Sequence, residues 1–195
     1  MNAKRRSSLA NPWPLEPSPS VLVCGLIAHD DAALADSERL LVERFGPVAG
    51  RSPVIPFDFT DYYEPEMGKN LIRCWLAFSR LVPSDSLAQT KLASIILERQ
   101  LAGLAVGQDR KSEIEARRLF ARRANLDPGL LSLHNFVLAS TKDYAHRICL
   151  GSGIHAELTL IYKSGRFEPL PWTYPDYRTA ACLDFLVRCR ELLKP

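Results

Sequence analysis

Residues 125–178 read NLDPGLLSLHNFVLASTKDYAHRICLGSGIHAELTLIYKSGRFEPLPWTYPDYR, and this stretch decides the fold class. Apolar runs of strand length alternate in it with short polar clusters. Two of these clusters, Gly151-Ser152-Gly153 and Ser164-Gly165, are typical of hairpin turns. We therefore predict an antiparallel β-meander that follows a short helix and precedes a closing helix. The predicted ranges are helix 131–140, strands 144–150, 154–162 and 166–170, and helix 178–193.

Upstream of this stretch, the periodic segments follow the order strand, helix, strand, strand, helix. The first segment is a continuous apolar run, which is typical of a strand covered on both faces. Asp30 or Asp31 is suited to cap the first helix, which Gly46-Pro47 ends, and Ser84 is suited to cap the second. The predicted ranges are strand 21–28, helix 30–45, strands 52–59 and 70–79, helix 84–105 and strand 124–131. Pro53 and Pro56 confine the strand 52–59 to an edge or to an irregular ladder.

Together these segments form a βαββαβ pattern, which is the split βαβ of ferredoxin-like sandwiches. The last strand contains Asp127-Pro128-Gly129, a turn sequence that weakens the strand prediction there. We predict an α+β fold in which a ferredoxin-like βαββαβ core is extended by the antiparallel β-meander and a C-terminal helix.

The sequence divides into a leader and one domain. Four prolines among residues 1–20 predict a stiff, disordered leader. Residues 21–195 are enough for one sizeable core, and we expect them to form a single domain. Within it, residues 107–123 carry an excess of basic side chains, which predicts an exposed basic insertion.

Composition indicates a soluble, cytoplasmic protein with no membrane partner. The formal net charge of +3 is too small to argue for nucleic acid by itself. The start of the chain has no apolar signal segment, and no apolar run is long enough to cross a bilayer. The five cysteines lie in apolar segments without a CxxC pair, as expected for reduced core cysteines. The oligomeric state stays open.

The densest polar cluster is residues 140–147, which read STKDYAHR. Lys142 and Arg147 offer positive charge for a phosphate or carboxylate group, and Asp143 or His146 could transfer protons. Two alternatives stay open. The cluster could cap backbone groups at a helix end, and the strand parity of His146 with apolar neighbours indicates a buried, hydrogen-bonded histidine.

Side chains elsewhere extend this candidate site. Arg178 is suited to binding an anion, and Tyr62 or Tyr177 could flank the organic part of a ligand. Asp58 and Asp61 supply oxygen ligands for magnesium if folding gathers them, or act as surface and capping residues.

Nucleotide and reaction motifs do not match. Gly68-Lys69 is followed by Asn70, whereas the GxxxxGK[ST] phosphate loop needs Ser or Thr there and Gly at the position of Tyr63. Nucleophilic catalysis by cysteine lacks support because every cysteine lies in an apolar run.

Four segments carry a family resemblance: PFDFTDYYEPEMG, NLDPGLL, LASTKDYAHRI and AELTLIYKSGRFEPLPWTYPDYR. Together they resemble a family of uncharacterised bacterial proteins, a domain of unknown function whose members are sometimes labelled GTP-binding proteins. The resemblance covers residues 21–193, and the chain departs from it in the leader and around residues 107–123. It implies a cytosolic bacterial protein with one domain, and no established activity.

Two functional hypotheses follow. In the first, an enzyme or sensor binds a phosphorylated small molecule or nucleotide through Lys142, Arg147 and Arg178, with Mg²⁺ as a candidate cofactor. Whether the ligand is also transformed stays open. In the second, a non-catalytic module binds RNA or a protein partner through the basic stretch 110–123 and the tail 4–6.

Overall fold

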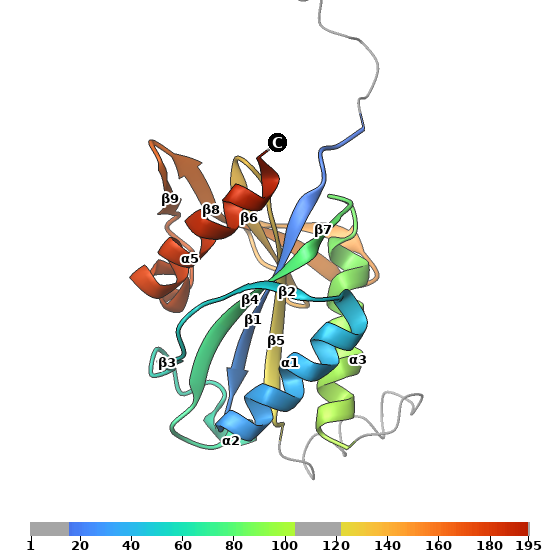
Figure 1. The fold of residues 1–195 in the computed structure, drawn as a ribbon. Helices are drawn as coiled ribbons and strands as arrows, with labels where there is room; N and C mark the ends of the chain where they lie inside the picture. The colour runs from blue at the N-terminus through green and yellow to red at the C-terminus, as the bar shows by residue number, and fades with distance from the viewer. Residues whose placement is uncertain (1–15, 104–121, 195) are drawn as a thin grey trace, which may run out of the picture.

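The computed structural model describes residues 16–103 and 122–194 (Figure 1). Within these ranges nine strands form one sheet in which all neighbours are antiparallel. The strands are β1 (Ser20–Ala28), β2 (Val48–Arg51), β3 (Ile55–Pro56), β4 (Ile72–Val82), β5 (Ala124–Leu131), β6 (Asn135–Ser140), β7 (Arg147–Gly151), β8 (Ile154–Lys163) and β9 (Arg166–Pro169). Their order is β2-β4-β1-β5-β6-β8-β7, with β3 beside β4 and β9 beside β8.

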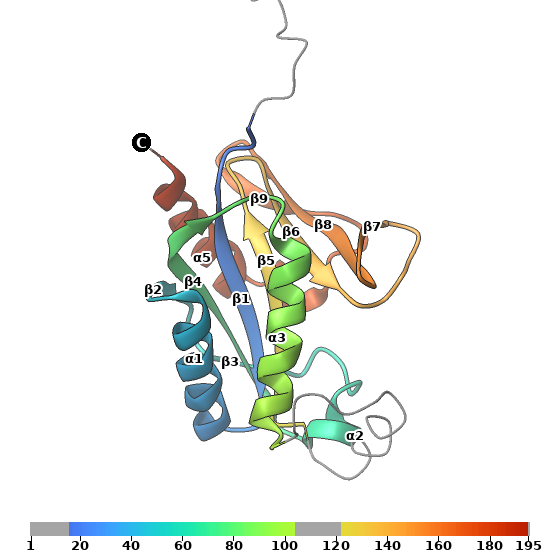
Figure 2. The same cartoon turned by 90° about the vertical axis from the view of Figure 1, so that its right-hand side faces the viewer.

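Helices cover both faces of this sheet (Figure 2). They are α1 (Asp31–Phe45), α2 (Glu64–Met67), α3 (Leu87–Leu101), α5 (Ala180–Arg190), η1 (Pro175–Arg178) and η2 (Glu191–Leu193). α1 and α3 share a core with Leu22 and Leu26 of β1, whereas α5 packs on the opposite face with Val21 and Val23. β1 is buried along its whole length because it lies between these two layers.

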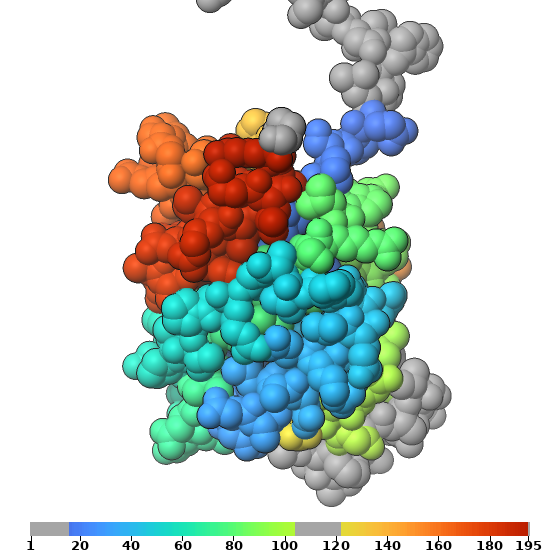
Figure 3. All heavy atoms as spheres, in the orientation of Figure 1, coloured from blue at the N-terminus to red at the C-terminus, as the bar shows by residue number. Residues whose placement is uncertain are grey.

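The sheet edge at β2 lies between helices of the two layers. Figure 3 looks onto this edge, with α5 (red) and α1 (blue) on either side of the cyan segment.

No helix in the described ranges is both long and apolar enough to span a membrane.

The α+β class, the antiparallel strands and the C-terminal helix are confirmed. β1, α1, β2, β4, α3 and β5 follow one another in the predicted order of element types, and their strands lie in the order β2-β4-β1-β5. The ferredoxin-like description itself stays a prediction. The predicted leader 1–20 and basic insertion 107–123 lie largely outside the described residues.

The helix predicted over residues 131–140 is wrong. Leu131 ends β5, and the residues after it form a tight turn and β6, in which Phe136 and Leu138 are buried with the two-residue period of a strand. Ser132 closes the turn, because its Oγ accepts hydrogen bonds from the N–H groups of His134 and Asn135. The polar turn and the alternation therefore outweigh the helical interpretation.

The strand predicted over residues 52–59, at an edge or in an irregular ladder, is much shorter in the structure. β2 ends before this segment, and β3 keeps only two residues of it, because Pro53 has no N–H for a ladder. Ser52 connects the segment to β4 instead. Its N–H donates to the Trp75 carbonyl and its Oγ accepts from the Trp75 N–H, both at 2.9 Å.

The sheet splits beside β5. β5 pairs with β1 along its full length, but it pairs with β6 only from Gly129 to Leu131. β6 continues beside β8 as far as Ser140. Pro128 immediately precedes Gly129, where the pairing with β6 stops. Because Pro128 has no N–H group, it cannot continue a regular hydrogen-bond ladder with β6. The two strands diverge and leave the side chain of Asp127 facing a gap in the sheet.

Candidate functional site

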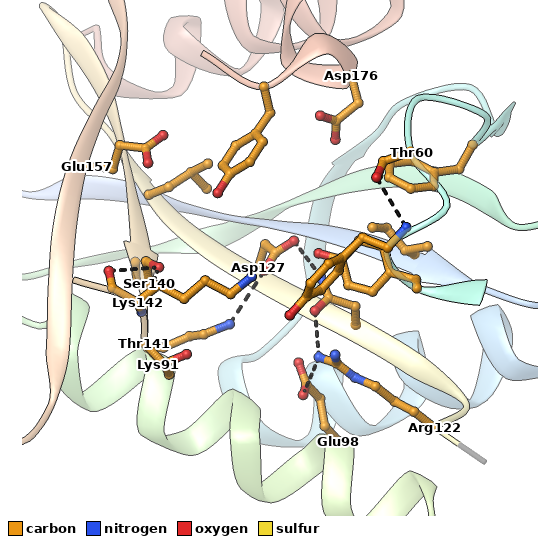
Figure 4. Close-up of a pocket in the computed structure, with 18 of the residues that line it drawn as sticks. Thr60, Lys91, Glu98, Arg122, Asp127, Ser140, Thr141, Lys142, Glu157 and Asp176 are labelled. Carbon is orange, nitrogen blue, oxygen red and sulfur yellow. Dashed lines mark hydrogen bonds and ion pairs between the residues drawn. The ribbon is translucent and has the colours of Figure 1, made fainter. Parts of the chain in front are cut away.

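A cavity of about 580 Å³ lies where β5 and β6 diverge. Figure 4 shows side chains converging on it from α3 (Lys91 and Glu98), β5 (Asp127), β6 (Ser140) and η1 (Asp176). Its aromatic lining comes from Phe57, Phe59, Tyr62, Tyr63, Tyr174 and Tyr177. Its charged lining consists of the cations Lys91, Arg99, Arg122, Lys142 and Arg147 and the anions Glu66, Glu98, Asp127, Glu157 and Asp176. The volume is that of a small-molecule site.

Asp127 is the central polar residue of this cavity. Lys91 Nζ lies 3.5 Å from its Oδ1, and Arg73 Nη1 lies 3.6 Å from its Oδ2. Asn125 donates a hydrogen bond to the same Oδ2. Burial would raise the pKa of Asp127, but neighbouring cations, Lys91 and Arg73 first, lower it below its usual value. Because its side chain is 24% exposed, an ionised carboxylate faces the cavity.

Arg73 lies behind Asp127, on β4, with a fully buried side chain. Its Nη2 is 2.9 Å from Asp176 Oδ2. Its guanidinium also contacts two aromatic rings, with the carbon 4.8 Å from the centre of Trp75 and 5.0 Å from that of Tyr177. Burial raises the pKa of Asp176, and the charge of Arg73 opposes this shift. Arg73 therefore holds two carboxylates and one tyrosine in place at the back of the cavity.

Tyr177 presents a hydroxyl group that forms no hydrogen bond with any described residue, although the residue is only 2% exposed. The ring is stacked on Phe136 at 5.8 Å and meets Trp75 edge-on at 5.7 Å. Burial raises the pKa of Tyr177 well above its usual value, so the phenol stays protonated. Buried polar groups are normally hydrogen-bonded. Since Tyr177 lines the cavity, a bound ligand is an available partner.

Two loops form the rim of the cavity. Lys142 follows β6, and its Nζ lies 4.0 Å from the centre of the Tyr62 ring, in the loop before α2. Ser140 Oγ accepts a hydrogen bond of 3.0 Å from the Lys142 N–H and so fixes the turn. Both Lys142 and Tyr62 are exposed. In the described part of the chain Lys142 forms no ion pair.

Arg147 holds the loop after β6 in place. Its Nε donates to Glu157, which is 1% exposed, at 2.8 Å, and its other nitrogens donate to the Lys142 carbonyl and the Tyr174 hydroxyl. His146 Nε2 lies 3.1 Å from the same carboxylate of Glu157. The charge of Arg147 is thus paired with that of Glu157, and the main effect of Arg147 is to position Lys142.

Four of the residues predicted to bind a ligand come together: Lys142, Arg147, Tyr62 and Tyr177 all line the cavity. Asp58 and Asp61, predicted to hold a metal, line a neighbouring hollow. Among the described residues, no group of three or more His, Cys, Asp or Glu side chains is arranged to hold a metal ion.

The other three predicted residues are not part of the cavity lining. Asp143 has an 83% exposed side chain, 3.6 Å from His155. His146 stacks on Trp172 with ring centres 4.9 Å apart. Arg178 donates hydrogen bonds to three carbonyls, those of Leu170, Pro171 and Thr173, and so closes the loop before η1.

Sequence reasoning missed Arg73 and Lys91. Arg73 interrupts the apolar strand segment 70–79, and Lys91 lies on a helix face that is otherwise buried. A charge inside an apolar pattern is the available signal, since such a charge needs a buried partner. Gly25, within an apolar strand, is a second signal, because glycine there marks a close approach.

The basic stretch 110–123 is mostly outside the described residues. Its last two residues are paired within the domain: Arg122 Nη2 lies 2.8 Å from Glu98, and Arg123 Nη1 lies 3.0 Å from Asp36. The described part of the stretch therefore provides no observation that favours the RNA- or protein-binding hypothesis.

Comparison with known proteins gives one match. The family model described as domain of unknown function DUF4416 matches residues 18–193. No curated protein and no solved structure matches the chain.

Proposed function

The chain belongs to the DUF4416 family, whose description states no activity, and from the geometry of its cavity we propose that it binds a phosphorylated small molecule or nucleotide. Lys142 supports this proposal most directly. It is a cation of the rim and forms no ion pair with a described residue, and the hydroxyl-bearing Ser140 and Thr141 precede it on the cavity wall. Ammonium and hydroxyl donors suit phosphate oxygens, which accept charge-assisted hydrogen bonds.

The present contact of Lys142 is one that a ligand can replace. An exposed cation–π contact such as that with Tyr62 contributes only about 0.5–1 kcal/mol. A phosphate at the rim would attract the ammonium more strongly and leave the Tyr62 ring free to stack on the organic part of the ligand. Phe59 and Tyr63, which are near Tyr62 in the sequence, also line the cavity and extend this aromatic surface.

The proposal concerns binding and assigns no reaction. The residues predicted to transfer protons, Asp143 and His146, are absent from the cavity lining. His146 is also engaged with Glu157 and Trp172. Within the cavity, Asp127 has a lowered pKa, which makes it a hydrogen-bond acceptor and a weak base.

A thermal-shift screen of the full chain with phosphorylated compounds, with and without Mg²⁺, tests the proposal. A ligand at 100 times its dissociation constant stabilises the protein by about 2.7 kcal/mol, which gives a clear rise in Tm. We expect Lys142→Met to remove this rise for compounds that stabilise the parent protein. Lys163→Met is the matched control, because Lys163 is exposed and does not line the cavity.

Two results would overturn the proposal. The first is a screen in which no phosphorylated compound raises the Tm. The second is a rise that Lys142→Met and Lys163→Met leave equally unchanged.

A further inference from the structure

The charges around the cavity limit how many phosphate groups its ligand carries. Five cationic and five anionic side chains line it. Lys91, Arg122 and Arg147 each lie in an ion pair with a carboxylate, at 3.5, 2.8 and 2.8 Å. A triphosphate brings several negative charges and would meet Asp127 and Glu157 without a matching excess of cations. The rim cation Lys142 suits a single phosphoryl group.

The cavity wall also offers one hydrogen-bond acceptor and one donor. The acceptor is the ionised carboxylate of Asp127, and the donor is the Tyr177 hydroxyl, which has no partner among the described residues. Both lie next to Gly25: it is the cross-strand neighbour of Asp127, and a Cβ at this glycine would lie 2.7 Å from the Tyr177 oxygen. The two groups are therefore close together at the cavity wall.

This pair complements two neighbouring hydroxyl groups. A hydroxyl group both donates and accepts. One ligand hydroxyl can donate to Asp127 while the next accepts from Tyr177. An apolar ligand end would leave both protein groups without partners, which costs binding free energy.

We infer that the ligand is a monophosphate ester of a hydroxylated carbon skeleton, a sugar phosphate or a nucleoside monophosphate, with its phosphoryl group at Lys142 and a hydroxyl pair at Asp127 and Tyr177. The inference rests on the proposed function. It adds the number of phosphate groups and the requirement for hydroxyl groups.

Isothermal titration calorimetry on the full chain tests both additions. The probes are ribose 5-phosphate, the four ribonucleoside 5′-monophosphates, their 2′-deoxy forms and the corresponding triphosphates. We expect a hydroxylated monophosphate to bind, its triphosphate to bind no more tightly, and its 2′-deoxy form to bind about tenfold more weakly. A comparison of the affinity for ribose 5-phosphate with the affinities for the nucleotides shows whether the aromatic wall binds a base.

Tyr177→Phe is the sharpest variant because it removes only an oxygen atom that has no described hydrogen-bond partner. Its fold is expected to persist, as circular dichroism would show. It should weaken binding of the hydroxylated monophosphate about tenfold and reduce the difference from the 2′-deoxy form. Tyr162→Phe is the control, because it removes a phenol oxygen from a residue that does not line the cavity.

The outcomes separate the inference from the proposed function. If no probe binds while another phosphorylated compound raises the Tm in the thermal-shift screen, the inference is wrong and the proposed function stands. If no phosphorylated compound binds in either experiment, both are wrong. If a triphosphate binds at least tenfold more tightly than its monophosphate, or if Tyr177→Phe binds every probe as the parent does, the inference is wrong while phosphate binding stands.

Discussion

Gly25 shows how one missing side chain makes room for the polar groups behind the cavity. A Cβ at this position would lie 2.6 Å from Arg73 Nη2 and 2.7 Å from the Tyr177 oxygen. Arg73 has little room to withdraw, since it contacts the rings of Trp75 and Tyr177 and pairs with Asp176. We expect Gly25→Ala to lower the free energy of unfolding by about 1–3 kcal/mol, as overpacking in a dense core does. Urea denaturation measures this change.

Gly50 provides the matched control on β2, which is separated from β1 by β4. A Cβ there would lie 3.5 Å from Cys189 Sγ and 3.6 Å from Phe185, which is ordinary van der Waals contact. Gly50→Ala should therefore be close to neutral. Equal destabilisation of the two variants would show that loss of glycine in a strand, and not the approach to Arg73, causes the effect.

Arg73 also shows why the site could be predicted only in part. Its position inside an apolar segment marks it as a buried charge. Its partners Asp127 and Asp176 come from β5 and η1, however, and no sequence spacing indicates that these elements meet. Lys142 and Arg147 were found because they lie in one short polar cluster, where local sequence suffices.

At the scale of elements, the start of α1 follows a local rule that the sequence already shows. Asp30 is the N-cap, and its side chain accepts a hydrogen bond of 2.7 Å from the Ala33 N–H. We expect Asp30→Ala to lower the free energy of unfolding by about 1 kcal/mol, since an unsatisfied N–H is left at the helix start. Thermal unfolding at neutral pH measures the loss.

The start of α3 provides the comparison. Ser84, predicted as its cap, instead donates a hydrogen bond to the Ser18 carbonyl, and the N-cap Ser86 makes no side-chain capping bond. Ser86→Ala should therefore cost less than Asp30→Ala. The reverse order would mean that capping does not determine the stability of these two helix starts.

Elements with a strong local pattern were predicted well, and those with mixed signals were not. β1 is continuously apolar and was predicted well, and β5 has the predicted bounds although Asp127-Pro128-Gly129 weakened that prediction. The segments that differ from prediction are 52–59, which contains two prolines, and 131–140, which contains a serine turn. The effects of both features depend on neighbouring strands. Ser52 bonds to β4, and β6 gains its ladder from β5 and β8.

At the scale of the whole molecule, the cavity results from strand pairing that no local pattern reveals. β5 stays with β1, β6 stays with β8, and the gap between them receives side chains from α3 and η1. The order of elements along the chain was accessible to sequence reasoning. The divergence of β5 from β6 could not be predicted from sequence, because it depends on whether β5 pairs with β1 or β6 and whether β6 pairs with β5 or β8.

Asp127 connects this cavity to the stability of the molecule as a function of pH. Burial would raise its pKa, but Lys91, Arg73 and other neighbours lower it in the folded state. The folded state therefore binds this proton less tightly than the unfolded state, whose Asp pKa is about 3.9. The resulting stabilisation is fully present above that value and is lost as the pH falls through the lower, folded pKa. Asp176, whose pKa is raised, acts in the opposite direction.

Asp127→Asn is expected to separate these contributions. At neutral pH it should lower the free energy of unfolding by about 3–5 kcal/mol, because Arg73 and Lys91 stay buried with one carboxylate fewer. Between about pH 5 and pH 2 its stability should fall less steeply than that of the parent, since the titrating group is gone. Urea midpoints across this pH range measure both effects. The exposed control Asp184→Asn should keep the acid dependence of the parent, and an equally steep fall in Asp127→Asn would assign that dependence to other carboxylates.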